Sequence, residues 1–319
     1  MPNYCSIERT FLLRGSQGYD RMDKEGVSAV VMERISFQKP DLHMHSVYSD
    51  GTDTPESLLQ NVRAAGLDLF ALTDHDTAEG CAAVRALLRP GDPAFIGGVE
   101  FSCRDGRGKY HVLGYGFDAD RPAIRETVAY AHHSRILKMK NRFGYLRQQY
   151  GFTFTPEEQA ELMGLKNPGK PHFAAMMLKK GYVKTKNEGF EVFASYRDTE
   201  PALPPEDAIS AILRSGGIPV LAHGILADGS GALTEEEITA RVGRFRAARF
   251  LGLECYYSAF TPRQREIMLN LAEKFFLLVT AGSDYHGTNK AVHLGQTGGP
   301  DPRRLQGFYD AIADRITIG

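Results

Sequence analysis

Short apolar runs alternate with segments of helical spacing along most of this chain. The runs "DLFALTD" and "AFIGGVEFS" are typical of buried strands, and "FLGLECYY" and "LLVTAGSDYHG" repeat the pattern nearer the C-terminus. Helical spacing occurs between them at residues 58–65, 82–88 and 262–275. Because short strands alternate with helices, the pattern predicts an α/β protein with mostly parallel strands.

The spacing changes between residues 119 and 205. Residues 123–150 have the pattern of one long helix, and residues 156–163 and 171–180 have that of two shorter helices. Strand signals are missing from this stretch. We therefore expect residues 119–205 to form a helical insert that acts as a lid.

The two flanking parts, residues 39–118 and 206–319, are expected to form one α/β body. Polar residues repeatedly come directly after its strands, which favours a (β/α) barrel with its site at the C-terminal rim of the strands. An open, doubly wound sheet is the alternative. Residues 1–38 lack clean periodicity, and we expect an N-terminal extension with little fixed structure.

Side chains that bind metal ions gather at the expected strand ends. They are His43, His45, Asp50, Asp74, His75, Asp76, Glu100, His111, His223, Asp284 and His286. One histidine after a strand is usually a packed or surface residue, but five separate strand ends share the feature here. His43 and His45 are two residues apart, so on a strand they point to the same face and can reach one ion.

The chemistry of this set narrows the metal. Imidazole nitrogens combined with carboxylate oxygens suit Mn²⁺, Fe²⁺ or Zn²⁺, and the lack of thiolates in the set disfavours a purely structural zinc site. The sequence therefore predicts a divalent metal centre.

Composition limits the function classes. The formal net charge of -1 argues against a protein that forms a stable complex with long nucleic acid. The apolar runs are far shorter than the ~20 residues that span a bilayer, so we expect no membrane partner. The four cysteines are scattered and we find no secretory leader, which together favour a cytoplasmic location.

Four motifs in order along the chain give a family resemblance. The segments "DLHMHSVYSDG", "ALTDHD", "VEFS" and "SDYHG" resemble the PHP (polymerase and histidinol phosphatase) superfamily of metal-dependent phosphoesterases, from Asp41 to Gly287. The segments "HVLGYGFD", "GKPHFAAMMLKKGYV" and "PEDAISAILRSGGIPVLAHG" are similar to its bacterial group of nucleoside 3',5'-bisphosphate phosphatases and 5'-3' exoribonucleases. The resemblance implies a distorted (β/α)7 barrel that holds two or three divalent ions, Mn, Fe or Zn.

The resemblance also implies three sets of ligands, one for each ion. The first set is His43, His45, Glu100 and Asp284. The second is Glu100, His111 and His223. The third is Asp50, His75 and His286. Of these residues, Glu100, His223 and Asp284 are expected to act in catalysis, and Asp74 and Glu254 are expected to orient imidazoles from behind.

Family and residues together predict the reaction. Hydroxide that bridges two ions would attack phosphorus in line with the leaving alcohol. A metal-bound water or an imidazole such as His223 would then protonate that alcohol.

Two basic runs in the insert suggest an anionic substrate. "AHHSRILKMKNRFGYLRQQY" and "LKNPGKPHFAAMMLKKGYVKTK" contain no acid, although solvated helix faces are the simpler explanation for most of their lysines. We expect Arg135 to bind phosphate through both guanidinium arms, with Lys170 and His172 next. The expected partner is a small phosphorylated nucleotide or short RNA.

The predicted function is hydrolysis of a phosphomonoester, in a nucleoside 3',5'-bisphosphate or short 5'-phosphorylated RNA. The alternatives are a histidinol phosphate phosphatase, a hydrolase of carbon–nitrogen bonds, and a metal-binding accessory module without catalysis. Tyr256, Tyr257 and Phe260 could stack on a base, although core packing is the more common role for such residues.

Overall fold

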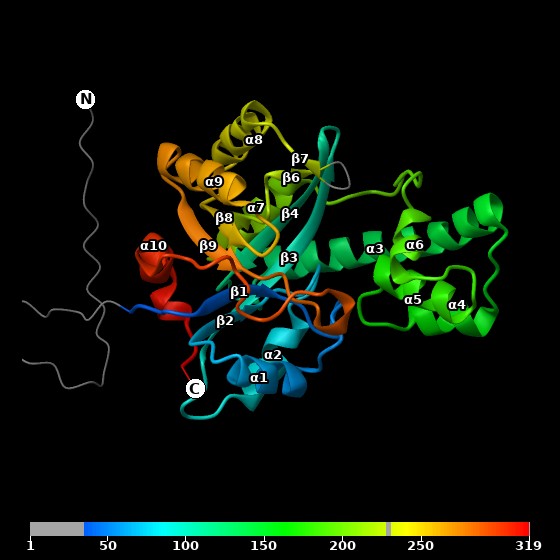
Figure 1. Cartoon of the computed structure of the whole chain (residues 1–319), viewed down its shortest axis with the longest axis horizontal. Coiled ribbons are helices and arrows are strands. Elements are labelled where there is room, and N and C mark those ends of the chain that lie inside the picture. Colours follow the sequence, from blue (N-terminus) through cyan, green and yellow to red (C-terminus); the bar gives the residue numbers. More distant parts are fainter. Residues whose placement is uncertain (1–34, 228–230, 319) are drawn as a thin grey trace, which may run out of the picture. The chain divides into compact units, whose positions relative to one another are not determined.

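Seven strands form one sheet that curls into a nearly closed barrel (Figure 1). The computed structural model describes residues 35–227 and 231–318, so most of the expected N-terminal extension lies outside the described residues. The barrel strands are β1 (Pro40–Met44), β2 (Leu69–Leu72), β3 (Ala94–Asp105), β4 (Gly108–Tyr115), β5 (Ile218–Leu221), β8 (Gly252–Tyr257) and β9 (Leu278–Gly282). Two short strands, β6 (Leu226–Ala227) and β7 (Gly231–Ala232), pair separately.

The strand order around the barrel is β1-β2-β3-β4-β5-β8-β9. All neighbours pair in parallel except β4, which runs antiparallel to both β3 and β5. The ring is closed at its C-terminal rim, where Met44 forms a parallel bridge with Tyr285 and the Asp284 amide donates to the His43 carbonyl at 2.8 Å. First and last strands thus meet, which confirms the predicted barrel and rules out the open sheet.

The helices of the barrel part lie outside the strands (Figure 1). They are α1 (Pro55–Ala64), α2 (Glu79–Leu87), α7 (Pro205–Arg214), α8 (Glu235–Ala247), α9 (Pro262–Lys274) and α10 (Pro302–Ile312), with 3-10 turns η1 (Gly287–Asn289) and η2 (Ala313–Arg315). Helix α7 packs on β3, β4 and β5, α9 on β8 and α10 on β9. Apolar side chains buried between helices and strands form the main core.

Several helix starts follow from local sequence. Thr54, Thr155 and Thr261 each precede a proline and accept a hydrogen bond from the backbone N–H three residues on. The threonine hydroxyl satisfies an amide that has no partner within the helix, and proline has no N–H to lose at the next position. These Thr-Pro pairs explain why α1, α4 and α9 begin where they do.

The expected insert is helical and has its own apolar cluster. Its helices are α3 (Pro122–Tyr150), α4 (Pro156–Met163), α5 (Lys170–Lys179) and α6 (Lys186–Glu191). They extend to one side of the barrel in Figure 1. Met139, Phe173 and Phe193 are among the residues buried between them. None of the helices in the described residues has the long apolar stretch required to cross a membrane.

The observed elements agree with most of the predicted ones. Helix α4 has the predicted bounds, and α3 and α5 each begin one residue earlier than expected. The pattern did not predict α6, α8 or α10, which are short or have a charged surface. It also placed Glu100 and His111 at strand ends, whereas Glu100 lies within β3 and His111 within β4.

Candidate metal centre and its pocket

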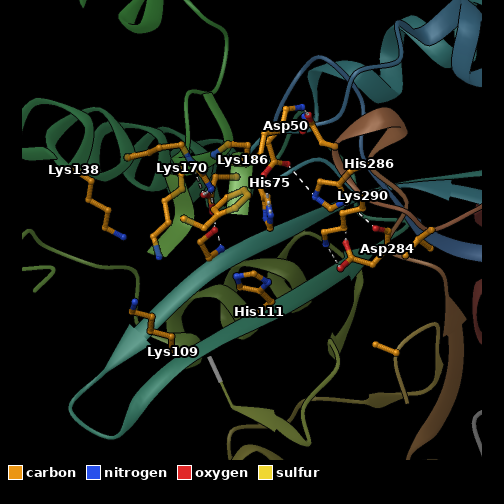
Figure 2. A pocket seen from close by; sticks show the side chains of 18 of the residues that line it. Asp50, His75, Lys109, His111, Lys138, Lys170, Lys186, Asp284, His286 and Lys290 are labelled. Atoms are coloured by element: carbon orange, nitrogen blue, oxygen red, sulfur yellow. Dashed lines mark hydrogen bonds and ion pairs between the residues drawn. The ribbon is translucent and has the colours of Figure 1, made fainter. Parts of the chain in front are cut away.

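All nine predicted ligands come together at one rim of the barrel. His43 lies in β1, Glu100 in β3 and His111 in β4. The other six lie in loops that leave the C-terminal ends of strands, and they are His45, Asp50, His75, His223, Asp284 and His286. Because β4 runs antiparallel, its beginning lies at the rim where the other strands end, and His111 therefore reaches the same space (Figure 2).

The first group of donors consists of His43, His45, Glu100 and Asp284, whose donor atoms lie within 4.8 Å of one another. Glu100 Oε2 is 3.2 Å from His43 Nε2 and 3.1 Å from His45 Nε2. Asp284 Oδ1 is 3.5 Å and 3.3 Å from the same two nitrogens. All four side chains are buried. This is the grouping expected for the first ion.

The second group shares Glu100 with the first. It contains Glu100, His75 and His111, with His75 Nδ1 3.1 Å from Glu100 Oε2 and His111 Nδ1 2.9 Å from Glu100 Oε1. His223 approaches the same oxygen, with its Nε2 at 3.3 Å. The two oxygens of Glu100 thus face different imidazoles, which suits a carboxylate that bridges two ions. His75 was expected with the third ion rather than here.

The third group contains His45, Asp50, His75 and His286. Asp50 Oδ1 is 3.2 Å from His286 Nε2, and Asp50 Oδ2 is 3.9 Å from His75 Nε2. The sequence placed Asp50, His75 and His286 together, and the structure adds His45 beside them. The ligand roles themselves stay a prediction.

The donor atoms at these positions fit metal ions. His43 Nε2, His45 Nε2, His75 Nδ1, His111 Nδ1 and Glu100 Oε2 are buried, and none has a hydrogen-bond partner among the described residues. Buried polar atoms without partners are costly and rare in proteins. Five such atoms, converging from four strands, are accounted for if they coordinate ions.

Electrostatics around Glu100 favour its charged form. Burial disfavours the charge, but the imidazoles of His111, His43 and His75 outweigh burial and hold the pKa of the Glu100 carboxyl well below its usual value. Burial also opposes protonation of His45, yet Asp284 and Glu100 raise the pKa of His45 to about 9. An ion bound by His45 would therefore displace a proton, because the ligand must be neutral.

Strained backbone is concentrated at this rim. Asp76, His223 and Asp284 have φ values of 53°, 31° and 60°, in the left-handed region that non-glycine residues seldom adopt. Such conformations cost on the order of 1–3 kcal/mol each and persist where surrounding structure imposes them. Here they direct side chains into the site.

Both residues expected to orient imidazoles are buried at the centre. Glu254 Oε1 is 2.9 Å from His43 Nδ1, and Glu254 Oε2 accepts from the His223 amide at 2.8 Å. Asp74 acts less directly, because it accepts from the hydroxyls of Ser46 and Ser49 at 2.7 and 2.6 Å. Ser49 Oγ in turn lies 3.4 Å from His45 Nδ1.

Two contacts of Asp284 were not predicted. The Tyr257 hydroxyl donates to Asp284 Oδ2 at 2.8 Å, and Lys290 Nζ donates to the same oxygen at 2.6 Å. Oδ1 is thereby left facing His43 and His45. For the lysine, the sequence offered only a weak signal, its position shortly after "SDYHG". For Tyr257 it offered none, because Tyr257 comes from a different strand.

A pocket of about 790 Å³ opens from the donor groups toward the insert. Asp50, His75, His111, Asp284 and His286 line one part of it, and Lys109, Lys138, Lys170 and Lys186 line another. Figure 2 shows His111 between Lys109 and Lys138 on one side and Asp284 and His286 on the other. A volume of this size suits a small organic ligand.

The three residues expected to bind substrate differ in position. Arg135 and Lys170 line the pocket. Arg135 also binds two barrel residues. Its Nε donates to Asp76 Oδ2 at 3.0 Å, and its Nη2 donates to the Ser102 hydroxyl at 2.9 Å. His172 Nδ1 accepts from the Gly169 amide at 2.9 Å and so caps the start of α5. Burial lowers the pKa of His172, which disfavours a charged phosphate-binding role.

The aromatic residues suggested for base stacking are buried. Tyr256, Tyr257 and Phe260 are 5%, 9% and 6% exposed, so their faces are covered by the protein. Tyr257 contributes its hydroxyl to Asp284, as described above. Core packing, the more common role, applies to these three residues.

Known proteins resemble the chain along most of its length. Residues 41–187 match the PHP domain. The 3',5'-nucleoside bisphosphate phosphatase of Chromobacterium violaceum is 30% identical over 77% of this chain and 86% of its own length. The phosphoribosyl 1,2-cyclic phosphate 1,2-diphosphodiesterase of Eggerthella lenta is 29% identical over 80% and 97%, and the 5'-3' exoribonuclease Rnm of Salmonella typhimurium is 28% identical over 80% and 88%.

Solved structures agree with these relatives. A Bifidobacterium adolescentis protein assigned as a metal-dependent phosphoesterase superposes with a TM-score of 0.72 at 28% identity, over 88% of this chain and 98% of its own. A Chromobacterium violaceum structure, named an amidohydrolase and containing sulfate but no metal, gives 0.73 at 26% identity with the same coverage. The chain belongs to the PHP family. It is a metal-dependent phosphoesterase, and its buried His, Asp and Glu clusters can hold the ions.

Proposed function

We propose that this phosphoesterase hydrolyses a phosphomonoester of a small nucleotide, a nucleoside 3',5'-bisphosphate or a short 5'-phosphorylated RNA. The observation that carries the proposal is one pocket with two chemically different ends. Metal-binding donors line one end, and cationic side chains from the insert line the other. A substrate with two separated phosphate groups matches both ends. The activities named for the relatives from Chromobacterium violaceum and Salmonella typhimurium support the same substrate class.

The charge of the pocket supports a polyanionic ligand. Seven cationic side chains line it: Lys109, Arg135, Lys138, Arg142, Lys170, Lys186 and Lys290. Four carboxylates line it too: Asp50, Asp76, Asp198 and Asp284. The excess of positive charge lies in a chain whose formal net charge is -1. A cleft lined by charge of one sign attracts the opposite sign and raises its local concentration.

At the metal end, we assign the predicted ligands to the reacting phosphate. Divalent ions held there would neutralise phosphoryl oxygens and activate water for attack on phosphorus. Glu100 and Asp284 provide the carboxylates that hold the ions. Lys290 lines the pocket beside Asp284, so its ammonium group is placed to approach the same phosphoryl group. His223 Nε2 faces Glu100 Oε1, which favours a ligand role for His223 over that of proton donor.

At the far end, we assign Lys138 and Arg142 to the phosphate that is not cleaved. Both are on α3, and Asp198 lies beside them, with Arg142 Nη2 3.8 Å from its Oδ1. Lys109 Nζ is 3.3 Å from the other oxygen of Asp198. The carboxylate keeps these long cationic side chains together while leaving net positive charge for the ligand.

We also propose that the helices within residues 119–205 act as a lid. Contacts between insert and barrel surround the site: Arg135 pairs with Asp76, and Asn167 donates to the His75 carbonyl. Lys186 Nζ donates to Asn289 Oδ1 at 2.8 Å. Because these contacts lie next to metal-binding residues, movement of the insert would change access to the reacting end.

The proposal is tested by phosphate release from metal-stripped protein resupplied with Mn²⁺. The substrates are adenosine 3',5'-bisphosphate, AMP, histidinol phosphate, a short 5'-phosphorylated RNA and phosphoribosyl 1,2-cyclic phosphate. Preferred turnover of the bisphosphate or the RNA is expected. Turnover of histidinol phosphate or the cyclic phosphate alone would contradict the nucleotide assignment while leaving the phosphoesterase class intact.

A further inference from the structure

One aromatic ring is exposed inside the pocket. Two phenylalanine or tyrosine residues are among the described residues lining it, Tyr257 and Phe190. Tyr257 is 9% exposed and its hydroxyl is bound to Asp284, whereas Phe190 is 38% exposed. Because more than a third of Phe190 stays exposed beside a pocket that is otherwise rich in charge, its ring can contact a ligand.

Phe190 is held in a defined position. It lies in α6, where the preceding residue, Gly189, is buried against α5. A Cβ on Gly189 would lie 2.8 Å from Ala174 Cβ and 2.9 Å from Ala174 Cα, closer than atoms can approach. Glycine therefore lets α6 sit directly on α5. The ring next to it is presented from a backbone that is firmly packed.

The face of α6 that carries Phe190 is connected to the metal end of the pocket by hydrogen bonds. Lys186 is four residues before Phe190, so their side chains leave α6 on one face. Lys186 Nζ donates to Asn289 Oδ1, and Asn289 Nδ2 donates to the Asp50 carbonyl at 2.8 Å. Asp50 Oδ1 in turn faces His286. A chain of contacts thus links the face carrying Phe190 to a predicted metal ligand.

We propose that Phe190 is the stacking platform for the nucleobase of the substrate, an inference that rests on the proposed function. The base is flat and apolar on its faces, and base–aromatic stacking is tolerant of base identity. With one phosphate at the metal end, the base lies against Phe190. Asn187, which lines the same wall, offers an amide donor and acceptor to the edge of the base.

The test compares two substrates that differ only in the base. One is adenosine 3',5'-bisphosphate, and the other is the same sugar bisphosphate with hydrogen in place of adenine. The proteins are wild type, Phe190→Ala, Phe190→Tyr, which keeps the ring, and Phe276→Ala as a matched control. Phe276 is 90% exposed and lies just before β9 begins, at the barrel end opposite the site.

The expected result is a loss confined to the nucleotide. Phe190→Ala should lower kcat/KM for adenosine 3',5'-bisphosphate by between about 5-fold and about 150-fold, the range for loss of one stacked base. Its activity on the base-free compound should stay at the wild-type level. Phe190→Tyr should retain the preference for the nucleotide, and Phe276→Ala should behave as wild type on both.

Two other results would each overturn a different statement. Suppose that the wild type hydrolyses the nucleotide, but Phe190→Ala lowers kcat/KM equally for both substrates or for neither. The proposed stacking role of Phe190 is then wrong, while the proposed function stands. If the wild type hydrolyses neither bisphosphate and also fails to hydrolyse the short 5'-phosphorylated RNA, the proposed function is wrong and the inference falls with it. Circular dichroism of each variant checks that the fold is retained.

Discussion

The two ends of the pocket are built in different ways. The metal end consists of short side chains on barrel strands and their loops, most of them buried, and held by partners such as Glu254 and Tyr257. The insert end is lined by long cationic side chains on α3, α5 and α6, and Arg142 of α3 shares the carboxylate of Asp198 with Lys109 of β4. Rigid donors suit chemistry that needs fixed geometry, and long flexible cations suit recognition of charge. Substitutions at the two ends should therefore differ in kind as well as in size.

The largest effect is expected from Asp284→Asn at the metal end. The amide removes the charge of a predicted ligand, and ions at such a site are worth several kcal/mol of transition-state stabilisation. Phosphate release with Mn²⁺ should fall on the order of 10³-fold or more. Asp92→Asn, which removes a carboxylate that pairs with Arg63 at the surface, is the control and should keep activity. Near wild-type turnover by Asp284→Asn would remove the basis for the assigned centre.

The next largest effect is expected where the insert meets the barrel, at the ion pair between Arg135 and Asp76. Arg135→Met leaves Asp76, 2% exposed, as an unpaired buried carboxylate. Removing one partner of a buried pair costs about 3–5 kcal/mol, so the free energy of unfolding in urea should fall by about that amount. The double variant Asp76→Asn with Arg135→Met should lose less than Arg135→Met alone, because no buried charge is left unpaired.

A surface pair provides the control for that measurement. Arg121 and Asp118 are 64% and 52% exposed, and Arg121→Met should change stability by roughly 0–1 kcal/mol. Equal losses of unfolding free energy for Arg135→Met and Arg121→Met would mean that Arg135 does not stabilise the contact between insert and barrel. Arg135 would then be free to bind the substrate, as the sequence alone suggested.

A smaller effect is expected from Tyr257→Phe, which removes one hydroxyl from behind Asp284. Loss of a partner that orients a ligand typically lowers metal affinity or activity about 10- to 100-fold. Titration calorimetry of stripped protein with Mn²⁺ measures the affinity directly. Tyr285→Phe is the matched control, because its hydroxyl donates to Asp53 Oδ2 instead of a predicted ligand. If both variants bind Mn²⁺ like wild type, Tyr257 does not position Asp284.

The smallest effect is expected from Lys138→Met at the insert end. Loss of one cation among several should raise KM for adenosine 3',5'-bisphosphate less than about 10-fold and leave kcat almost unchanged, as for a contact made equally in ground and transition states. The effect should shrink at high salt, since exposed charges are screened. A fall in kcat with constant KM would instead place Lys138 in the chemical step and remove the distinction between the two ends.

Much of the metal end could be predicted because its signals are local. Strand period and motif spacing placed His43, His45 and Asp284 at strand ends, and strand ends of a barrel meet at one rim. The grouping of the second set stays a prediction, since it depends on how imidazoles share the two oxygens of Glu100. His75 and His223 both approach Glu100, and only packing determines that arrangement.

The insert end could not be predicted to the same degree. Two acid-free runs indicated a basic lid, but not that Arg135 pairs with Asp76, 59 positions away, or that His172 caps α5. Nor could sequence distinguish the exposed ring of Phe190 from the buried rings of Tyr256 and Phe260.

By itself, the sequence determined the α/β class and the family and favoured the barrel, because these depend on residue types and motifs at short, regular spacing. The family resemblance supplied the set of predicted metal ligands. Tertiary structure decided which partner each side chain takes. His43 meets Glu254 across 211 positions, and the pair exists only because β1 and β8 belong to one closed barrel. Contacts between segments that are distant in the sequence carry no local pattern, and such contacts join Tyr257 to Asp284 and Arg135 to Asp76.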